Sequence, residues 1–219
     1  MAAMPVTPAA VVPLRTRDAD RTQQAILRAA TAEFAELGLG GARIDAIAER
    51  AGVNKRLIYY YFTGKEELFL AVLEQTYADI RQAERELQLE STPPVQALRR
   101  LVAFTWEHYL AHPEFLTLLN SENLHRARHL KQSSRVREMN SPLIQTLGDV
   151  LERGRREGLF RGGIDPLQLY ISIAGLAYFY LSNNHTLSAI FGRDLMSAKA
   201  LSQRLSHITE VVMGYVLLD

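Results

Sequence analysis

The sequence contains no cysteine, no run of 18 apolar residues and almost no net charge, with a formal value of +1. Without cysteine the chain forms no disulfide bond and offers no thiolate to a metal, which fits a reducing cytosol, and we expect a cytoplasmic protein. Without a long apolar run we expect no membrane span. Because the whole-chain charge is close to zero, any charged binding surface must come from local clustering.

The composition is that of a globular chain, with 47% apolar and 22% charged residues over 219 positions. This length is enough for one large domain or two small ones with a buried core. The opening segment is interrupted by prolines and lacks the basic start and long apolar centre of a secretory signal. We expect residues 1–17 to be a disordered arm, whose basic end, Arg15 and Arg17, could touch an anionic partner.

Apolar residues recur at three- and four-residue steps from Asp18 onward, which predicts helices throughout. A first helix ends at a group of glycines near Gly38, and a short second helix ends at Gly52. A long helix is expected over 65–89, and "STPP" then separates it from the second half. Further helices are predicted near 94–111, 113–124, 133–157, 165–183 and 196–217. No segment alternates with a period of two, so the predicted fold class is all-α.

The two short helices joined by "AGVN" have the size and turn chemistry of a helix-turn-helix. Asn54 is a good N-cap for the second helix, which we expect to lie in the major groove of DNA. Lys55 and Arg56 stand in its first turn, where they can reach guanine acceptors or phosphates. Leu57 can contact a thymine methyl group.

Three consecutive tyrosines follow the basic pair and are expected to separate by angle around the helix. Tyr59 lies one turn after Lys55 and can run along the groove, Tyr60 can donate to a phosphate, and Tyr61 turns toward the packing side with Phe62. Lys65 stands at the N-terminus of the next helix, which favours phosphate. Between Asn54 and Lys65 there are three cations and no acid, so the local charge is +3. A basic pair beside aromatic residues is more often a solvated edge of a core, but the helix lengths, the glycine stop and the Asn54 cap favour DNA binding.

Residues 26–73, from "ILRAATAEF" to "LFLAVL", resemble the DNA-binding domain of the tetracycline repressor family of bacterial transcription regulators. The resemblance implies an N-terminal helix-turn-helix domain over 18–66 and a regulatory and dimerisation domain over 67–219. It also implies that Lys55, Arg56 and Tyr59 read bases, while Arg43, Tyr60 and Lys65 hold phosphates. Arg43, Arg56 and Leu57 depart from the smaller or hydroxyl-bearing residues common in the family, which leaves the operator sequence open.

The same resemblance implies a homodimer built on the last two long helices and a small-molecule pocket among the middle ones. The segment "LQLYISIAGLAYFYL" is apolar on nearly every side, which predicts a helix buried by its own domain or by a second subunit. For the dimer interface we expect Leu167, Tyr170, Ala174, Ala177, Leu201, Leu205, Ile208 and Val212. For the ligand the candidates are Phe104, Trp106, Tyr109, Asn120, Asn123, Tyr178 and Asn183, and for each of them core packing or surface exposure is the competing interpretation.

Two histidine pairs, His108/His112 and His125/His129, have the i, i+4 spacing of a helical metal site. No glutamate of the zinc-protease helix pattern accompanies them, and cations surround the second pair, so we expect no metal and no cofactor. The predicted function is that of a sequence-specific DNA-binding regulator, a repressor released from a palindromic operator by a small molecule. The alternatives are a helical ligand-binding adaptor or an enzyme that no longer binds DNA; no nucleophile–base pattern or phosphate loop supports an enzyme.

Overall fold

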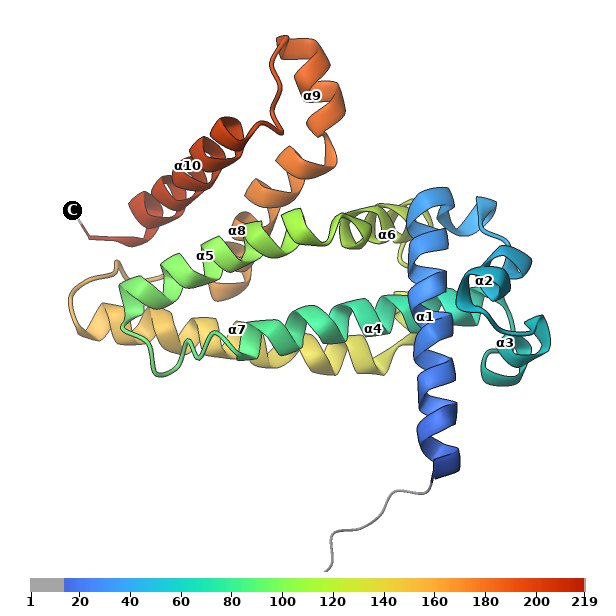
Figure 1. Ribbon diagram of the computed structural model, residues 1–219. Helices are drawn as coiled ribbons and strands as arrows, with labels where there is room; N and C mark the ends of the chain where they lie inside the picture. Colours follow the sequence, from blue (N-terminus) through green and yellow to red (C-terminus); the bar gives the residue numbers. More distant parts are fainter. Residues whose placement is uncertain (1–13, 219) are drawn as a thin grey trace, which may run out of the picture. The chain divides into compact units, whose positions relative to one another are not determined.

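The computed structural model describes residues 14–218, without the side chains of residues 14–17, 140 and 141. These residues form two compact units, of which the first reaches to Phe69 and the second starts at Leu70. Helices account for both units, and within the described range the sole β contact is an isolated bridge between Phe160 and Leu217 (Figure 1). The all-α prediction is confirmed.

The first unit contains α1 (Leu14–Gly41), α2 (Ile44–Ala51), α3 (Lys55–Tyr61) and the start of α4 (Lys65–Arg85). The helix predicted from Asp18 thus begins at Leu14, while most of the predicted N-terminal arm and the side chains of Arg15 and Arg17 lie outside the described residues. Gly38 has a φ of 66°, which breaks the helical backbone near the predicted end of the first helix.

The core of the first unit is made by apolar side chains from all four helices. Phe34 and Phe69 are fully buried and meet edge to face, with ring centroids 5.1 Å apart. Ile47 of α2 and Ile58 of α3 are also fully buried. Burial of a large aliphatic side chain is worth about 1.5–3 kcal/mol, so these contacts hold the two short helices in place.

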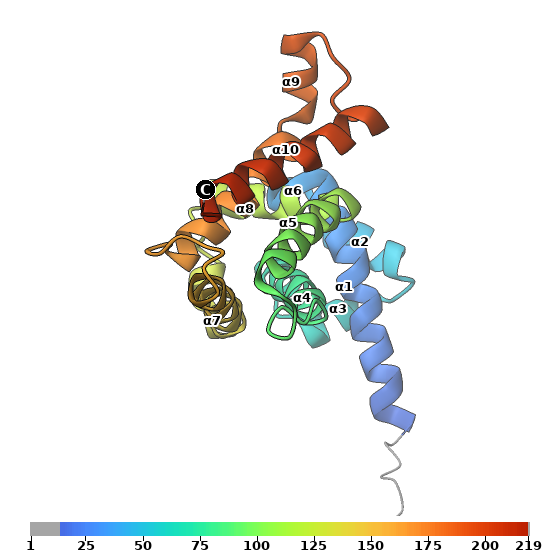
Figure 2. The ribbon, with the colours of Figure 1, turned by 90° about the vertical axis from the view of Figure 1, so that its left-hand side faces the viewer.

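The second unit holds the rest of α4 and six further α-helices. They are α5 (Pro94–Ala111), α6 (Pro113–Leu124), α7 (Ser134–Arg156), α8 (Pro166–Ser182), α9 (Asn184–Phe191) and α10 (Ala198–Val216). In Figures 1 and 2, α5 lies against α8 and α10, and α9 stands away from the other helices of this unit. The predicted ranges 94–111 and 113–124 coincide with α5 and α6. The predicted boundaries of the other long helices of this unit differ from the observed ones by at most four residues, and α9 was not predicted.

No helix in the described part of the chain combines the length and the apolarity needed to cross a membrane.

Candidate nucleic-acid interface and ligand cavity

The turn between α2 and α3 is fixed by backbone chemistry encoded in the sequence. Gly52 adopts the left-handed conformation (φ 66°, ψ 32°), and its N–H donates to the carbonyl of Glu49 over 3.1 Å. The side chain of Asn54 accepts a hydrogen bond of 2.9 Å from the N–H of Arg56. Both features were predicted and are confirmed, and they set the direction in which α3 leaves the turn.

The N-terminus of α2 is capped from another helix. Arg43 has no side-chain cap of its own, but its N–H donates to the buried carboxylate of Glu33 on α1, at 3.3 Å. Arg50, at the far end of α2, forms ion pairs with Glu33 at 3.5 Å and with Glu36 at 3.2 Å. Glu33 therefore fastens both ends of α2 to α1, a function that sequence reasoning missed.

One face of α3 is buried and the opposite face is exposed. Ile58 and Phe62 lie in the core, as predicted. Tyr59 is half exposed, Tyr60 is 79% exposed, and Tyr61 is partly buried with its ring 5.1 Å from that of Tyr60. The three tyrosines thus separate by angle as the sequence predicted. Six of the residues predicted to contact DNA are exposed and the seventh, Lys65, is half-buried: Arg43, Lys55, Arg56, Leu57, Tyr59, Tyr60 and Lys65.

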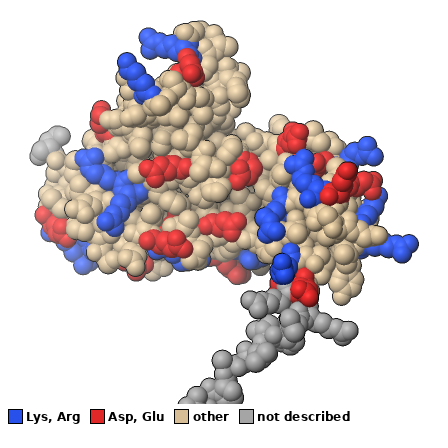
Figure 3. Space-filling model, in the orientation of Figure 1, with Lys and Arg blue, Asp and Glu red and all other residues tan. Residues whose placement is uncertain are grey.

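Two of the predicted cations already have partners within the first unit. Lys55 forms an ion pair of 2.7 Å with Asp45 of α2, and this hydrogen bond raises the pKa of the Lys55 ammonium. Lys65 donates to the carbonyl of Ala42 at 3.1 Å and to that of Gly40 at 3.4 Å. Asp45 therefore offsets part of the positive charge of α3, and among the described residues Arg56 has no acidic partner. Figure 3 shows acidic and basic side chains interspersed over the first unit.

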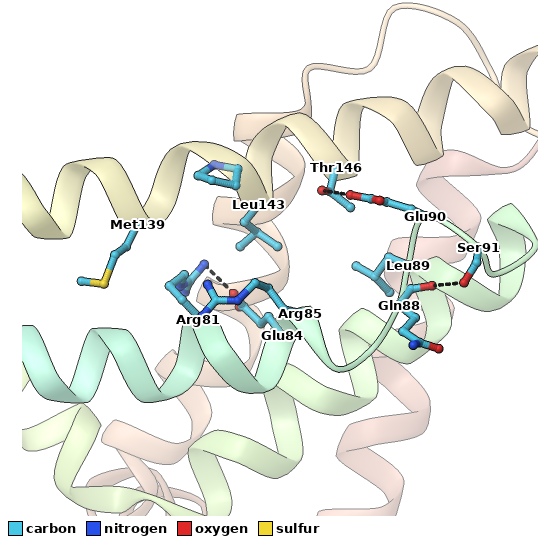
Figure 4. Close-up of a pocket in the computed structure, with 11 residues that line it drawn as sticks. Arg81, Glu84, Arg85, Gln88, Leu89, Glu90, Ser91, Met139, Leu143 and Thr146 are labelled. Atoms are coloured by element: carbon cyan, nitrogen blue, oxygen red, sulfur yellow. Dashed lines mark hydrogen bonds and ion pairs between the residues drawn. The ribbon is translucent and has the colours of Figure 1, made fainter. Parts of the chain in front are cut away.

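A cavity of about 450 Å³ lies within the second unit, between α4, the segment after it and α7 (Figure 4). Arg81 and Glu84 project from α4 into the space below α7, where Leu143 faces them. Met139 and Pro142 of α7 also line the cavity. The volume falls in the range of small-molecule sites. Its further lining residues are Arg85, Gln88, Leu89, Glu90, Ser91 and Thr146.

None of the seven residues predicted for the ligand lines this cavity. Trp106 and Tyr109 are buried in the core of the unit, and Phe104 packs on His108. The hydroxyl of Tyr178 donates to Asn120. Asn123 donates to the Leu119 carbonyl, and Asn183 donates to the Phe179 carbonyl. These aromatic and amide side chains take part in packing and in local hydrogen bonds.

The residues predicted for the dimer interface differ in their exposure. Ala177, Ile208 and Val212 are buried inside their own unit and have no surface left for a second copy. Tyr170 is half-buried, and its hydroxyl accepts a hydrogen bond from Arg81. Leu201, Leu205 and Ala174 are partly buried, and Leu167 is exposed. The exposed apolar side chains of α8 and α10 are Leu167, Ile171, Phe179, Val211 and Tyr215.

The histidine pairs are occupied by local contacts. The rings of His108 and His112 lie 4.4 Å apart, and burial, together with the nearby His112, lowers the pKa of His108 to about 4. His125 bonds to the Ser121 carbonyl at 2.7 Å, and the buried Glu122 accepts from His129 Nδ1 at 2.6 Å. Across the described residues no three histidine, aspartate or glutamate side chains gather as a metal site.

The exposed basic α3, the capped turn and the separate helical unit with its own cavity define a helix-turn-helix DNA-binding protein with a regulatory domain. The comparisons agree with this class. The family model "Bacterial regulatory proteins, tetR family" matches residues 26–72, and "Tetracyclin repressor-like, C-terminal domain" matches residues 94–212. The chain belongs to the tetracycline repressor family of DNA-binding transcription regulators.

Individual relatives extend this result over most of the chain. The HTH-type transcriptional repressor NicS of Pseudomonas putida is 44% identical over 91% of this chain and 94% of its own length. The regulator RutR of Escherichia coli K12 is 27% identical over 91% and 92%, respectively. Among solved structures, a regulator of this family from Marinobacter aquaeolei has a TM-score of 0.69 at 20% identity, covering 94% of this chain and all of the other; it shows the fold alone.

Proposed function

We propose that this protein is a cytoplasmic repressor that binds a palindromic operator as a homodimer and leaves it when a small molecule occupies the regulatory unit. The observation that carries the proposal is the geometry of α2 and α3, in which a capped turn presents exposed Arg56, Tyr59 and Tyr60 away from a buried Ile58. The proposed activity needs binding alone and no chemical step. The names of NicS and the related SCO4008 as transcriptional repressors support the sign of regulation.

Base reading is assigned to Lys55, Arg56, Leu57 and Tyr59, and phosphate binding to Arg43, Tyr60 and Lys65. Because Lys55 is paired with Asp45, it must break this ion pair before it can contact DNA. Arg56 can contact DNA without breaking an ion pair. An arginine in the first turn of a recognition helix most often bonds the O6 and N7 atoms of guanine. We therefore expect a guanine opposite Arg56 in each half-site.

The dimer is proposed to form on the exposed apolar face defined by Leu167, Ile171, Phe179, Val211 and Tyr215. A soluble monomer rarely leaves so many large apolar side chains exposed on two adjacent helices. In Figure 3 the part of the second unit made by α8, α9 and α10 is mostly uncharged. A two-fold axis across this face would place two copies of α3 for two half-sites about one DNA turn, roughly 34–36 Å, apart or somewhat more.

The response to a small molecule is placed in the cavity between α4 and α7. A ligand can release DNA only if it binds the DNA-free conformer more tightly than the DNA-bound one. Solved relatives with the same fold include a regulator from Bacillus subtilis in complex with stearoyl-CoA, with a TM-score of 0.63 at 16% identity. Stearoyl-CoA is the ligand of that protein. For this chain we infer the kind of ligand from the size and chemistry of the cavity.

The test is selection of bound fragments from genomic DNA, followed by fluorescence anisotropy of the best fragment at two salt concentrations. We expect a short palindrome and an affinity that falls steeply with salt. The Arg56→Ala variant should lose about 1–3 kcal/mol of binding free energy and relax the preference at one position. Lys65→Ala should weaken binding to all sequences alike and lower the salt slope by about one.

A matched control is Arg28→Ala, which removes an exposed arginine from α1 of the same unit and should leave the base preference unchanged. If Arg56→Ala kept both the affinity and the base preference of the wild type, the placement of α3 in the groove would be wrong. If no fragment were enriched over random duplex, the proposal would give way to a helical adaptor without DNA binding.

A further inference from the structure

Arg81 is a charged residue whose side chain is buried inside the second unit. Its side chain is 3% exposed and lies on the wall of the cavity. Its Nη2 donates to the hydroxyl of Tyr170 at 2.8 Å, but among the described residues its Nε and Nη1 have no hydrogen-bond acceptor. A buried donor without an acceptor costs roughly 1–3 kcal/mol, and more when it belongs to a charged group.

Glu84 does not supply the missing acceptor. Its Oε2 lies 2.8 Å from Arg81 Nη1, but the pair lacks the geometry of a hydrogen bond, and Oε2 itself has no donor among the described residues. Both side chains are almost completely buried. A buried ion pair with unmet hydrogen bonds stabilises a fold less than apolar side chains of the same size. Folding alone therefore does not account for this pair.

The charge balance around Arg81 favours an anion. Burial raises the pKa of Glu84 to about 7, against the opposing effect of Arg81 and Arg85. Near neutral pH this carboxyl group is thus protonated in about half of the molecules and repels an anion less than an ordinary glutamate. Tyr170 can turn its hydroxyl hydrogen toward an acceptor, while Glu90, the other acid of the lining, is hydrogen-bonded to Thr146 at 3.2 Å.

The opposite wall of the cavity is apolar. Met139, Pro142 and Leu143 come from α7 and Leu89 from the segment after α4, and Figure 4 shows Leu143 facing Arg81 and Glu84 across the open space. A site with a buried charged anchor on one wall and an apolar wall opposite it selects a ligand with a charged head and an apolar body. A volume of about 450 Å³ admits a body of one or two rings or a short alkyl chain.

We propose that this cavity binds a small organic acid, with the carboxylate on the Arg81 guanidinium and the apolar body against Met139 and Leu143. This inference rests on the proposed function and names the chemical class of its effector. The ligand carboxylate supplies the acceptor that Arg81 lacks and displaces Glu84 from it. Arginine and a carboxylate form charge-assisted hydrogen bonds about twice as strong as neutral ones.

Arg81 and Lys65 lie on the same helix, α4. One continuous helix carries Lys65 at its first position and Arg81 sixteen residues later, about 24 Å along the axis. The start of α4 belongs to the first unit, in which Lys65 holds the carbonyls of Gly40 and Ala42.

The experiment is calorimetric titration of the full chain with three acids, benzoate, phenylacetate and hexanoate, each beside its neutral amide. We expect at least one acid to bind ten times or more tightly than its amide. The Arg81→Gln substitution should lower the affinity for that acid by tenfold to a hundredfold, because it removes the charged donor. The matched control is Arg204→Gln, which removes a partly buried arginine that donates to the Leu176 carbonyl and lies outside the cavity; it should bind the acid as the wild type does.

A second variant keeps the inference testable if Arg81→Gln does not fold. Glu84→Gln removes the competing carboxylate and should bind the acid as tightly as the wild type or more tightly. The inference is overturned if no acid binds better than its amide, if Arg81→Gln folds and binds the acid unchanged, or if Glu84→Gln abolishes binding. Fluorescence anisotropy with the selected operator is measured alongside. If the wild type binds the operator and no acid changes this binding, the effector class alone is refuted. If the wild type shows no sequence-specific DNA binding, the proposed function is refuted.

Discussion

Replacing Ile171 by glutamate should convert the proposed dimer into a folded monomer. Ile171 lies on α8, is 52% exposed in one copy of the chain and belongs to the proposed dimer face. Two residues later on the same helix, Ile173 is fully buried. The same substitution at these two positions of one helix therefore distinguishes an effect on dimer association, expected at Ile171, from an effect on folding, expected at Ile173.

The expected size follows from the exposed fraction. Full burial of an isoleucine side chain is worth about 1.5–3 kcal/mol, so covering the exposed half of Ile171 contributes about 1 kcal/mol. A two-fold interface contains this residue twice, which gives about 2 kcal/mol, and burying two carboxylates adds several more. We expect the dimer dissociation constant to rise by at least a hundredfold.

Analytical ultracentrifugation at several concentrations measures this effect, with circular dichroism as a check of the fold. Ile171→Glu should sediment as a helical monomer and lose cooperative operator binding. Ile173→Glu should lose helical signal and thermal stability instead, because it buries a charge in the core of the unit. A dimeric Ile171→Glu protein with wild-type affinity would show that the face defined by α8 and α10 is not the interface.

Two further substitutions test the interior of the second unit. A Cβ atom at Gly154 would lie 2.0 Å from the Phe160 ring, so Gly154→Ala should lower the free energy of unfolding by about 1–3 kcal/mol in chemical denaturation. Gly148 lies in the same helix, and the nearest atom to a Cβ placed there is 3.7 Å away. Gly148→Ala should therefore raise the free energy of unfolding by up to about 1 kcal/mol. Equal changes in stability for the two variants would contradict the packing of Phe160 on Gly154. Burial raises the pKa of Glu84 from 4.5 to about 7, so the folded state holds this proton more tightly and its stability falls as pH rises. Between pH 5 and 8 the wild type should lose about 2 kcal/mol relative to Glu84→Gln, and parallel curves for the two proteins would exclude this ionisation.

Local chemistry in the sequence was sufficient to predict the DNA-binding helices. A left-handed turn at Gly52 and a side-chain cap at Asn54 depend on neighbours within a few residues, and both occur in the structure. The alternation of buried Ile58 with exposed Tyr59 and Tyr60 follows from the helical period alone. The ion pair of Lys55 with Asp45 could not be predicted with the same security, because it requires the angle between two helices.

The helical period of apolar residues does not predict which side chains of α8 form the proposed dimer face. The segment of α8 is apolar on nearly every side, so the sequence indicates that it is buried. The sequence does not indicate which side of the helix faces the core. The packing of α5, α7 and α10 against α8 decides that Ile173 and Ala177 face the core and that Ile171 and Phe179 remain exposed.

The sequence by itself determined the all-α fold class, the helix-turn-helix and its capped turn, because each depends on contacts between residues close together in the chain. Only the tertiary structure formed the cavity in which we propose that a ligand binds. Arg81 and Glu84 look like ordinary surface charges on a long helix, and their burial is produced by side chains from α7 and α8, about 60 to 90 residues away. The free energy of a charged group is set by the dielectric and the hydrogen-bond partners around it, and these exist only once distant helices have packed.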